Sequence, residues 1–327
     1  MSSIADTPPP GRPRIEALDL ARGLALLAMA SYHFTWDLEF FGYADPGMTA
    51  VGGWKLYARC IASTFLVLVG ISLVLAHGDG IRWKGFARRL AMVAGAALAI
   101  TAATWWFVPE GMIFFGILHQ IALASVLGLA FLRWPPLLTL AVAALVVLAP
   151  HYLRSDFFDH PALWWVGLAP VNPRSNDYVP LFPWFGAVLA GIALGRFAID
   201  SGLVLRFAAF HPGPWSRPLR FAGRHSLAVY LIHQPVLIGL IWLFAQVYPA
   251  AELPRPAQFT SSCERSCEQT RDAGFCARYC GCMLEALEQD GKLDALFAGD
   301  GSAELRAQVE DLAAQCTART ETTPPGG

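Results

Sequence analysis

Long apolar segments separated by short polar ones make up most of the first 250 residues of this chain. A membrane-spanning helix needs about 20 mostly apolar residues. Segments of this kind are expected at 17–39, 56–76, 87–108, 112–132, 135–152, 181–198 and 226–248. The apolar stretch at 160–170 is too short to span and is expected to be an interfacial or re-entrant piece. The pattern predicts an all-α protein, a polytopic transmembrane helix bundle of about seven spans.

Composition supports this interpretation, because 55% of the 327 residues are hydrophobic and 15% are charged. The formal net charge of −1 gives no support for a nucleic-acid partner. Three parts are expected along the chain. They are a proline-rich, disordered tail at 1–14, a transmembrane domain at 15–250, and a charged, cysteine-rich tail domain at 251–327.

Lysine and arginine predict the orientation of the spans, because cytoplasmic loops carry an excess of these residues. With the N-terminus inside, the cytoplasmic side holds Arg12, Arg14, Arg82, Lys84, Arg88, Arg89, Arg133, Arg196, Arg206, Arg217, Arg220 and Arg224. Before the tail, the opposite side holds Lys55, Arg59, Arg154 and Arg174. Seven spans then place the C-terminal tail outside.

The cysteines support the same orientation. Six of the seven lie in the tail, at Cys263, Cys267, Cys276, Cys280, Cys282 and Cys316. An even number of clustered cysteines is typical of a disulfide framework in an oxidising compartment. The i, i+4 spacing places each of the first two pairs on one face of a short helix, and an antiparallel hairpin would pair Cys263 with Cys280 and Cys267 with Cys276. Cys282 then remains for Cys316, one of the fifteen connectivities that six cysteines allow. A zinc site is the alternative, and the spacing does not match a standard zinc finger.

The first apolar segment carries ionisable residues that a membrane helix normally excludes. Asp19, Arg22, His33 and Asp37 lie within it or at its ends. Such side chains are costly in a bilayer, so they usually face a protein interior or a watery cavity and have a function. Arg22 and His33 are eleven residues apart, which places them on one helix face, roughly 16 Å apart along the axis. Asp19 lies about one turn before Arg22, and Asp37 about one turn after His33.

Further polar residues lie inside other apolar segments. His119 and Gln120 are in the fourth expected span, and His233 and Gln234 are in the last. The alternative for an isolated intramembrane histidine is a purely structural hydrogen bond between helices. Several such residues in separate segments of one small bundle favour a functional site instead. No metal site is expected.

Five segments in the right order resemble the bacterial DUF1624 family, which is similar to the catalytic domain of heparan-alpha-glucosaminide N-acetyltransferase and belongs with the transmembrane acyltransferases. They are the Asp19-x-x-Arg22-Gly23 start, the Arg22-x10-His33 spacing, GILHQIALAS at 116–125, PWFG at 183–186 and GRHSLAVYLIHQP at 223–235. The resemblance covers about residues 14–250. The chain has fewer spans than the larger relatives, and the cysteine-rich tail lies outside the family pattern.

The resemblance implies transfer of an acyl group, acetyl from cytoplasmic acetyl-CoA, to a hydroxyl or amine of a sugar-like acceptor beyond the membrane. In wider acyltransferase relatives, essential residues stand at the positions of Arg22 and His33. Acyl transfer needs a base with a pKa near neutrality. His33 is therefore expected to be the general base, oriented by Asp37 and assisted by His119 or His233. The CoA phosphates are expected to meet a cytoplasmic basic site made of Arg22, Arg88, Arg89, Arg220 and Arg224.

Two other functions stay open on the sequence. Intramembrane Asp, Arg and His also build proton relays, so a proton-coupled transporter or flippase is the first alternative. The second is a membrane anchor that presents the cysteine-rich tail as a binding module. The expected location is the bacterial inner membrane, with a cytoplasmic N-terminus and a periplasmic tail. The expected partners are membrane lipid, acyl-CoA and a glycan or other acceptor, and a homo-oligomer is compatible with the sequence.

Overall fold

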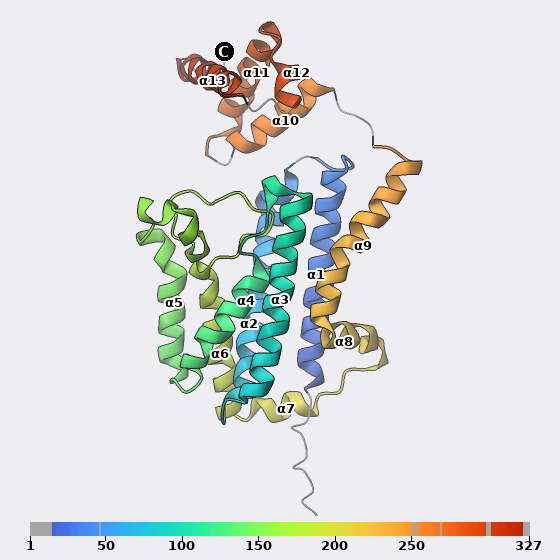
Figure 1. Cartoon of the computed structure of the whole chain (residues 1–327), viewed down its shortest axis with the longest axis vertical. Coiled ribbons are helices and arrows are strands. Elements are labelled where there is room, and N and C mark those ends of the chain that lie inside the picture. Colours follow the sequence, from blue (N-terminus) through green and yellow to red (C-terminus); the bar gives the residue numbers. More distant parts are fainter. Residues whose placement is uncertain (1–14, 46, 251–253, 269, 299–301, 323–327) are drawn as a thin grey trace, which may run out of the picture. The chain divides into compact units, whose positions relative to one another are not determined.

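The computed structural model describes residues 15–45, 47–250, 254–268, 270–298 and 302–322, and regular structure in these residues is helical throughout (Figure 1). The expected disordered segment 1–14 lies outside the described residues. The α-helices are α1 Glu16–Phe40, α2 Gly52–His77, α3 Trp83–Phe107, α4 Ile117–Gly128, α5 Pro136–Tyr152, α6 Leu181–Asp200, α7 Leu203–Ala209, α8 Arg217–Arg224, α9 Ser226–Val247, α10 Arg255–Cys267, α11 Ala273–Gln289, α12 Leu293–Phe297 and α13 Ala303–Thr322. Short 3₁₀ helices are η1 Met48–Ala50, η2 Pro109–Gly111, η3 Leu129–Phe131, η4 Asp156–Asp159, η5 Pro161–Val166 and η6 Pro214–Ser216.

Each of the seven segments expected to span a membrane contains a helix. Of the described helices, α2, α3, α6 and α9 are long and apolar enough to cross a bilayer, whereas α4 and α5 are shorter apolar helices. The 25-residue α1 is long enough to span, but its polar side chains make it less apolar than these four helices. The chain is therefore a helical membrane protein, and the total of seven spans stays a prediction. The segment at 160–170 contains only the short η5, in keeping with its length.

The fold divides into two compact units that share α1 and α9. Of the described residues, unit 1 comprises those from 15 to 29 and from 59 to 233, and unit 2 comprises those from 30 to 58 and from 234 to 322. The first half of α1 and the start of α9 thus belong to unit 1, while the remainder of both helices belongs to unit 2.

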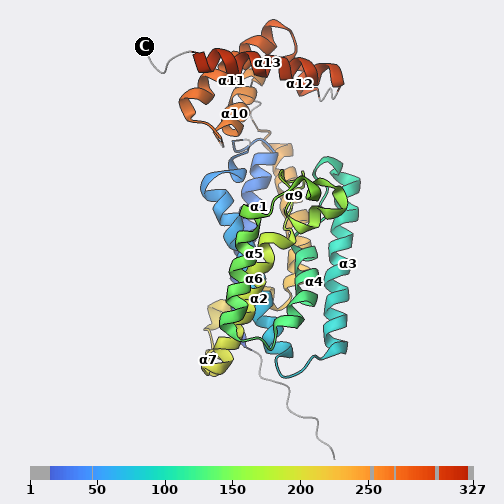
Figure 2. The same ribbon diagram turned by 90° about the vertical axis from the view of Figure 1, so that its left-hand side faces the viewer.

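The core of unit 1 forms where α2, α4, α5 and α6 pack together, with α5 beside α6 in both side views (Figures 1 and 2). Its fully buried side chains include Leu66, Val188 and Ile192. Glycines let α2 and α6 approach closely. A Cβ atom on Gly70 would lie 2.1 Å from the carbonyl oxygen of Val188. Small residues at such crossings are typical of membrane helix packing.

Many large apolar side chains of unit 1 are exposed rather than buried. Trp106 is 83% exposed and Leu137 is 81% exposed, and both lie on apolar helices. In a water-soluble protein such a surface would be a liability. Here it suits contact with lipid.

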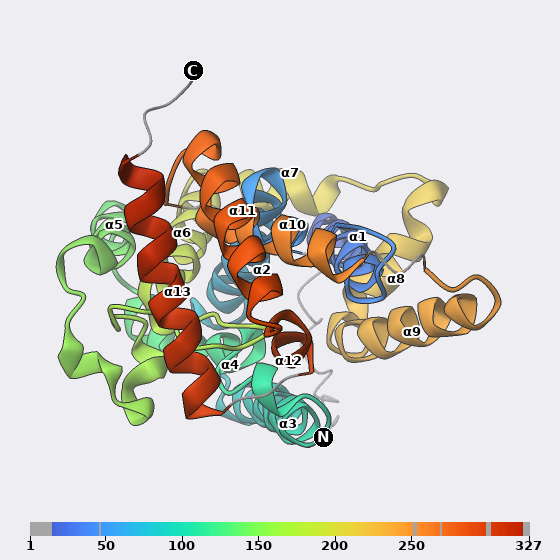
Figure 3. The same cartoon turned by 90° about the horizontal axis from the view of Figure 1, so that it is seen from above.

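The C-terminal part of unit 2 is a small helical assembly stapled by disulfides (Figure 3). α10 and α11 form the expected hairpin, with Cys263 bonded to Cys280 and Cys267 bonded to Cys276. Cys282 is bonded to Cys316, which ties α11 to α13, shown beside it in red. The pairing predicted from the hairpin geometry is confirmed. Met283, Leu287, Leu293 and Leu305 are buried in these helices.

Candidate active site

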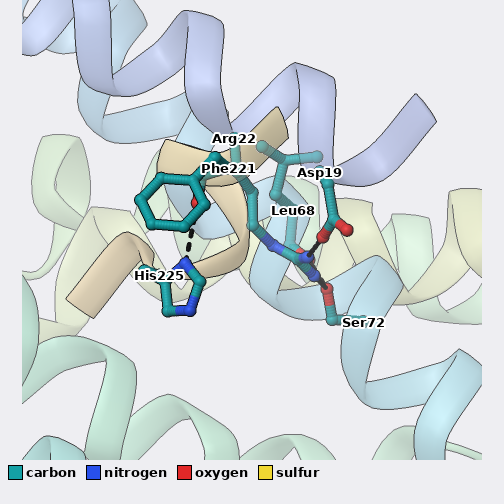
Figure 4. A network of polar contacts seen from close by, with 6 residues as sticks. All are labelled: Asp19, Arg22, Leu68, Ser72, Phe221 and His225. Atoms are coloured by element: carbon teal, nitrogen blue, oxygen red, sulfur yellow. Dashed lines mark hydrogen bonds and ion pairs between the residues drawn. The ribbon is translucent and has the colours of Figure 1, made fainter. Parts of the chain in front are cut away.

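Arg22 is the centre of a polar network in unit 1 (Figure 4). Its Nη1 donates to Oδ1 of Asp19, one turn earlier on α1, at 3.1 Å. Its Nη2 donates to Oγ of Ser72 on α2 at 2.6 Å. The Ser72 hydroxyl donates in turn to the carbonyl of Leu68, so its oxygen is left to accept from the guanidinium. The network fixes the position of a guanidinium within an otherwise apolar segment.

This guanidinium borders a cavity of about 590 Å³ whose described lining lies entirely in unit 1. Three arginines from three helices line it, namely Arg22 of α1, Arg89 of α3 and Arg224 of α8. Its remaining lining comprises Phe65, Leu68, Val69, Ser72, Met92, Val93, Leu118, Ile121, Gly223, His225, Ser226, Leu227, Ala228, Tyr230 and Leu231. The cavity combines apolar walls with a cluster of like charges. Because like charges repel, such a cluster favours an anionic ligand.

The junction between α8 and α9 forms one side of this cavity. His225 caps the C-terminal end of α8, and its backbone N–H donates to the carbonyl oxygens of Phe221 and Ala222. Its ring lies 4.5 Å from that of Phe221 between centroids, and Nδ1 lies 3.0 Å from the Phe221 carbonyl oxygen (Figure 4). A carbonyl can only accept, so Nδ1 carries the hydrogen. α9 begins directly afterwards at Ser226, so its first turn borders the cavity.

Two glycines bring α1 and α8 together beside Arg22. A Cβ atom on Gly223 would lie 1.8 Å from the carbonyl oxygen of Asp19, and one on Gly23 would lie 2.0 Å from that of Leu219. Real side chains do not fit at these distances, so the crossing requires glycine on both helices. The Asp19-x-x-Arg22-Gly23 start and the Gly223-Arg224-His225 segment are therefore neighbours in space.

The five arginines expected at the donor site occupy different surroundings. Arg22, Arg89 and Arg224 line the cavity. Arg88 directly precedes Arg89 on α3, and Arg220 forms an ion pair with Glu16 at 2.6 Å and donates from Nε to Ser216. Arg88 and Arg220 lie outside the described cavity lining.

His119 is hydrogen-bonded through both ring nitrogens in unit 1. Nδ1 accepts from the backbone N–H of Gly116, so Nε2 carries the hydrogen and faces Oγ1 of Thr101 on α3 at 3.2 Å. The Thr101 hydroxyl lies 2.7 Å from the carbonyl oxygen of Ile113 and donates to it. These contacts hold the connection between α3 and α4.

His33 and Asp37 lie in unit 2, one turn apart on α1. The ring of His33 packs edge-on against Tyr32, with centroids 5.7 Å apart. Asp37 is fully buried, and its Oδ1 accepts from Nε2 of Gln234 at 2.6 Å. His233, in unit 1, points Nδ1 at the carbonyl oxygen of Tyr230 at 2.6 Å.

Sequence reasoning did not identify Ser72, Tyr230 or Asp177. Ser72 orients Arg22, Tyr230 lines the cavity, and Asp177 accepts from the first backbone N–H of α4 at Ile117. Ser72 could have been found as a buried hydroxyl in an apolar helix. Asp177 could not, because its role depends on a loop that returns to the start of α4.

The fold and the site thus define the class of protein: a helical membrane protein with a cationic cavity. The family described as heparan-alpha-glucosaminide N-acetyltransferase, catalytic, matches residues 14–235, and the chain belongs to this family. Membership indicates a membrane enzyme of the acetyltransferase type. No curated protein and no solved structure matches the chain. The matched range ends before the disulfide-stapled helices, which lie outside the family domain.

Proposed function

We propose that the protein transfers an acetyl group from acetyl-CoA to an amine or hydroxyl of a sugar-like acceptor on the opposite side of the membrane. The observation that carries this proposal is the cavity lined by Arg22, Arg89 and Arg224 within the matched family domain. CoA carries several phosphate charges, and arginine binds phosphate oxygens through paired N–H groups. The apolar wall suits the pantetheine arm.

The size of the cavity supports a ligand rather than a packing defect. Small-molecule sites commonly have volumes of roughly 300–1,000 Å³ and combine apolar walls with a few polar groups. The volume of about 590 Å³ falls within that range. The three arginines come from α1, α3 and α8, so an anion bound between them would link helices that are far apart in sequence.

In the proposed reaction the acceptor nitrogen or oxygen attacks the thioester carbonyl, and the bond to sulfur breaks as the new bond forms. A base takes the acceptor proton, and the departing CoA thiolate is protonated. We assign the base role to His33, because a histidine titrates near neutral pH and α1 carries it together with Arg22. His119 or His233 is proposed to assist, and His119 would do so by holding the connection between α3 and α4.

The proposed sidedness follows from the distribution of basic residues. Lysine and arginine gather on the side expected to be cytoplasmic, where CoA is available. The acceptor would then be reached from the periplasmic side of a bacterial inner membrane. The disulfides of the tail suit that oxidising compartment.

CoA binding by adjacent arginine variants tests the donor site. Arg89→Gln removes a cavity-lining charge, whereas Arg88→Gln removes the neighbouring charge outside the described lining. A charged hydrogen bond contributes about 1.5–3 kcal/mol, so Arg89→Gln is expected to weaken CoA affinity by about tenfold to a hundredfold. Arg88→Gln is the control and should change affinity less than about twofold. Wild-type affinity should also fall with salt. Equal effects of the two variants would contradict the assignment of the cavity.

Transfer of labelled acetyl from acetyl-CoA, followed in purified protein in nanodiscs, tests the chemistry. His33→Asn is expected to reduce transfer by about 10²–10⁴-fold, the usual contribution of a general base, while CoA affinity stays unchanged. Near-normal turnover in His33→Asn would remove His33 from the mechanism. CoA binding without transfer to any amine or sugar acceptor would instead favour a transporter.

A further inference from the structure

A buried carboxyl and a half-buried amide join α1 to α9 inside unit 2. Asp37 has no solvent exposure, and Nε2 of Gln234 donates to its Oδ1 at 2.6 Å. The second oxygen of each group, Oδ2 of Asp37 and Oε1 of Gln234, is also buried and has no hydrogen-bond partner among the described residues. Two acceptors in one pair thus lack a donor.

An ionised Asp37 would make this arrangement costly. A buried carboxylate needs a cation or several donors, and a buried acceptor without a donor loses its hydration without replacement. The pair offers a single N–H donor to the carboxylate. The missing element is therefore one donor placed between the two groups.

Other titratable groups lie on the parts of α1 and α2 that belong to unit 2, and one directly precedes Gln234. On α1 they are Tyr32, His33 and Glu39, on α2 Lys55 and Tyr57, and His233 directly precedes Gln234. Glu39 accepts from the backbone N–H of Gly47 and from Thr49, Tyr32 donates to the Thr49 carbonyl, and Tyr57 shares a hydrogen bond with Ser31. Lys55 is exposed. The remainder of α9, from Pro235 to Val247, contains no titratable residue.

We propose that Asp37 is a proton-binding site: it stays a neutral carboxylic acid at neutral pH and pairs edge to edge with the Gln234 amide. The two groups are complementary, because the acid C=O accepts from the amide N–H while the acid O–H donates to the amide C=O. One proton on Oδ2 of Asp37 thereby makes this oxygen a donor and gives Oε1 of Gln234 the donor that it lacks. The pair then carries no charge, which suits its place inside apolar helices.

This inference concerns the joint between α1 and α9 and does not depend on acetyl transfer. It gives Asp37 a different role from that expected on the sequence, where a negatively charged Asp37 would orient His33. It also has a consequence for stability. The folded protein keeps a proton that the unfolded chain releases, so this contribution is present at low pH and is lost as pH rises.

Infrared spectroscopy of the whole protein in nanodiscs tests the protonation directly. At neutral pH the wild type should show the C=O stretch of a protonated carboxyl group, shifted on transfer to D₂O. Asp37→Asn should remove this band. Asp177→Asn is the control, because Asp177 is a half-buried carboxyl outside the expected spans whose pKa is raised by burial, and the substitution should leave the Asp37 band in place. If no band depends on Asp37, its carboxyl group is ionised and is stabilised by water or a cation. That result would overturn the proposal.

Variant stability provides a second readout. Asparagine reproduces both hydrogen bonds of the neutral acid, so Asp37→Asn should keep the wild-type Tm at neutral pH and lose less Tm on alkalinisation. Asp37→Ala and Gln234→Leu each break the pair and should lower Tm. If Asp37→Asn is as unstable as Asp37→Ala, the charge of Asp37 matters rather than its proton, and the proposal fails. The infrared comparison between wild type and Asp37→Asn stays decisive if Asp37→Ala does not fold.

Discussion

Asp177 shows how a single carboxyl makes the stability of unit 1 depend on pH. It accepts from the Ile117 N–H at 2.9 Å, at the start of α4, and burial raises the pKa of Asp177 to about 6. The backbone hydrogen bond opposes this shift and is the smaller effect. An Asp in the unfolded chain has a pKa of about 3.9. Between these values the folded state binds more protons than the unfolded state.

The sign of the pH dependence follows. The contribution of Asp177 is fully present below about pH 4 and is lost as pH rises through about 6. Asp177→Asn keeps an acceptor for Ile117 and removes the titration. Thermal unfolding between about pH 4 and 7 should therefore show a flatter Tm profile in Asp177→Asn than in the wild type. Parallel profiles would contradict the assignment.

Helix crossings in unit 1 depend on glycine where backbones meet. Gly223→Ala would place a Cβ atom 1.8 Å from the Asp19 carbonyl oxygen, which is backbone and cannot rotate away. Overpacking typically lowers the free energy of unfolding by about 1–3 kcal/mol, and we expect a loss near the upper end for Gly223→Ala. CoA binding should also be lost, because α8 would move away from Arg22. Gly95→Ala on α3 is the control, since no atom of the described neighbours lies within 4 Å of its added Cβ. Its Tm should be unchanged or higher. Equal Tm in the two variants would show that α1 and α8 are not tightly packed.

The helices of the tail depend on covalent bonds to differing degrees. The Cys282–Cys316 bond closes a loop with a sequence separation of 34, and Cys267–Cys276 closes one of 9. In the chain-entropy model the two bonds stabilise the fold by about 3.8 and about 2.6 kcal/mol. Replacing Cys282 and Cys316 by serine should therefore destabilise the tail more than replacing Cys267 and Cys276. Limited proteolysis of the full chain, read at the tail, measures this. A reversed order would show that strain or residual structure outweighs loop closure.

At the scale of the whole molecule, the proposed sidedness can be tested with single cysteines in a Cys60→Ser background, since Cys60 is the free and exposed thiol of the described residues. Asn172→Cys lies in the exposed connection before α6, and Ser201→Cys lies just after α6. An impermeant thiol reagent applied to intact cells should label Asn172→Cys and leave Ser201→Cys unlabelled. Labelling after permeabilisation is the control for access to Ser201→Cys. The opposite pattern would invert the topology and the proposed side of CoA binding.

Much of the architecture follows from the sequence alone, because its determinants are local. A run of about 20 apolar residues must form a helix in a bilayer, where no water is present to satisfy the backbone. The helices found in all seven expected segments reflect that constraint. The two hairpin disulfides were predicted from the i, i+4 spacing on two consecutive short helices, which places Cys263 opposite Cys280 and Cys267 opposite Cys276.

The site was only partly predictable, because it depends on which helix faces meet. The sequence identified Arg22 as an exceptional residue in an apolar segment, but it did not indicate that Arg89, rather than the adjacent Arg88, lines the cavity. Nor did it indicate that Asp37 would meet Gln234, 197 positions away. Helical periodicity determines which residues share a face. The tertiary packing, through close contacts such as those at Gly23 and Gly223, decides what that face meets.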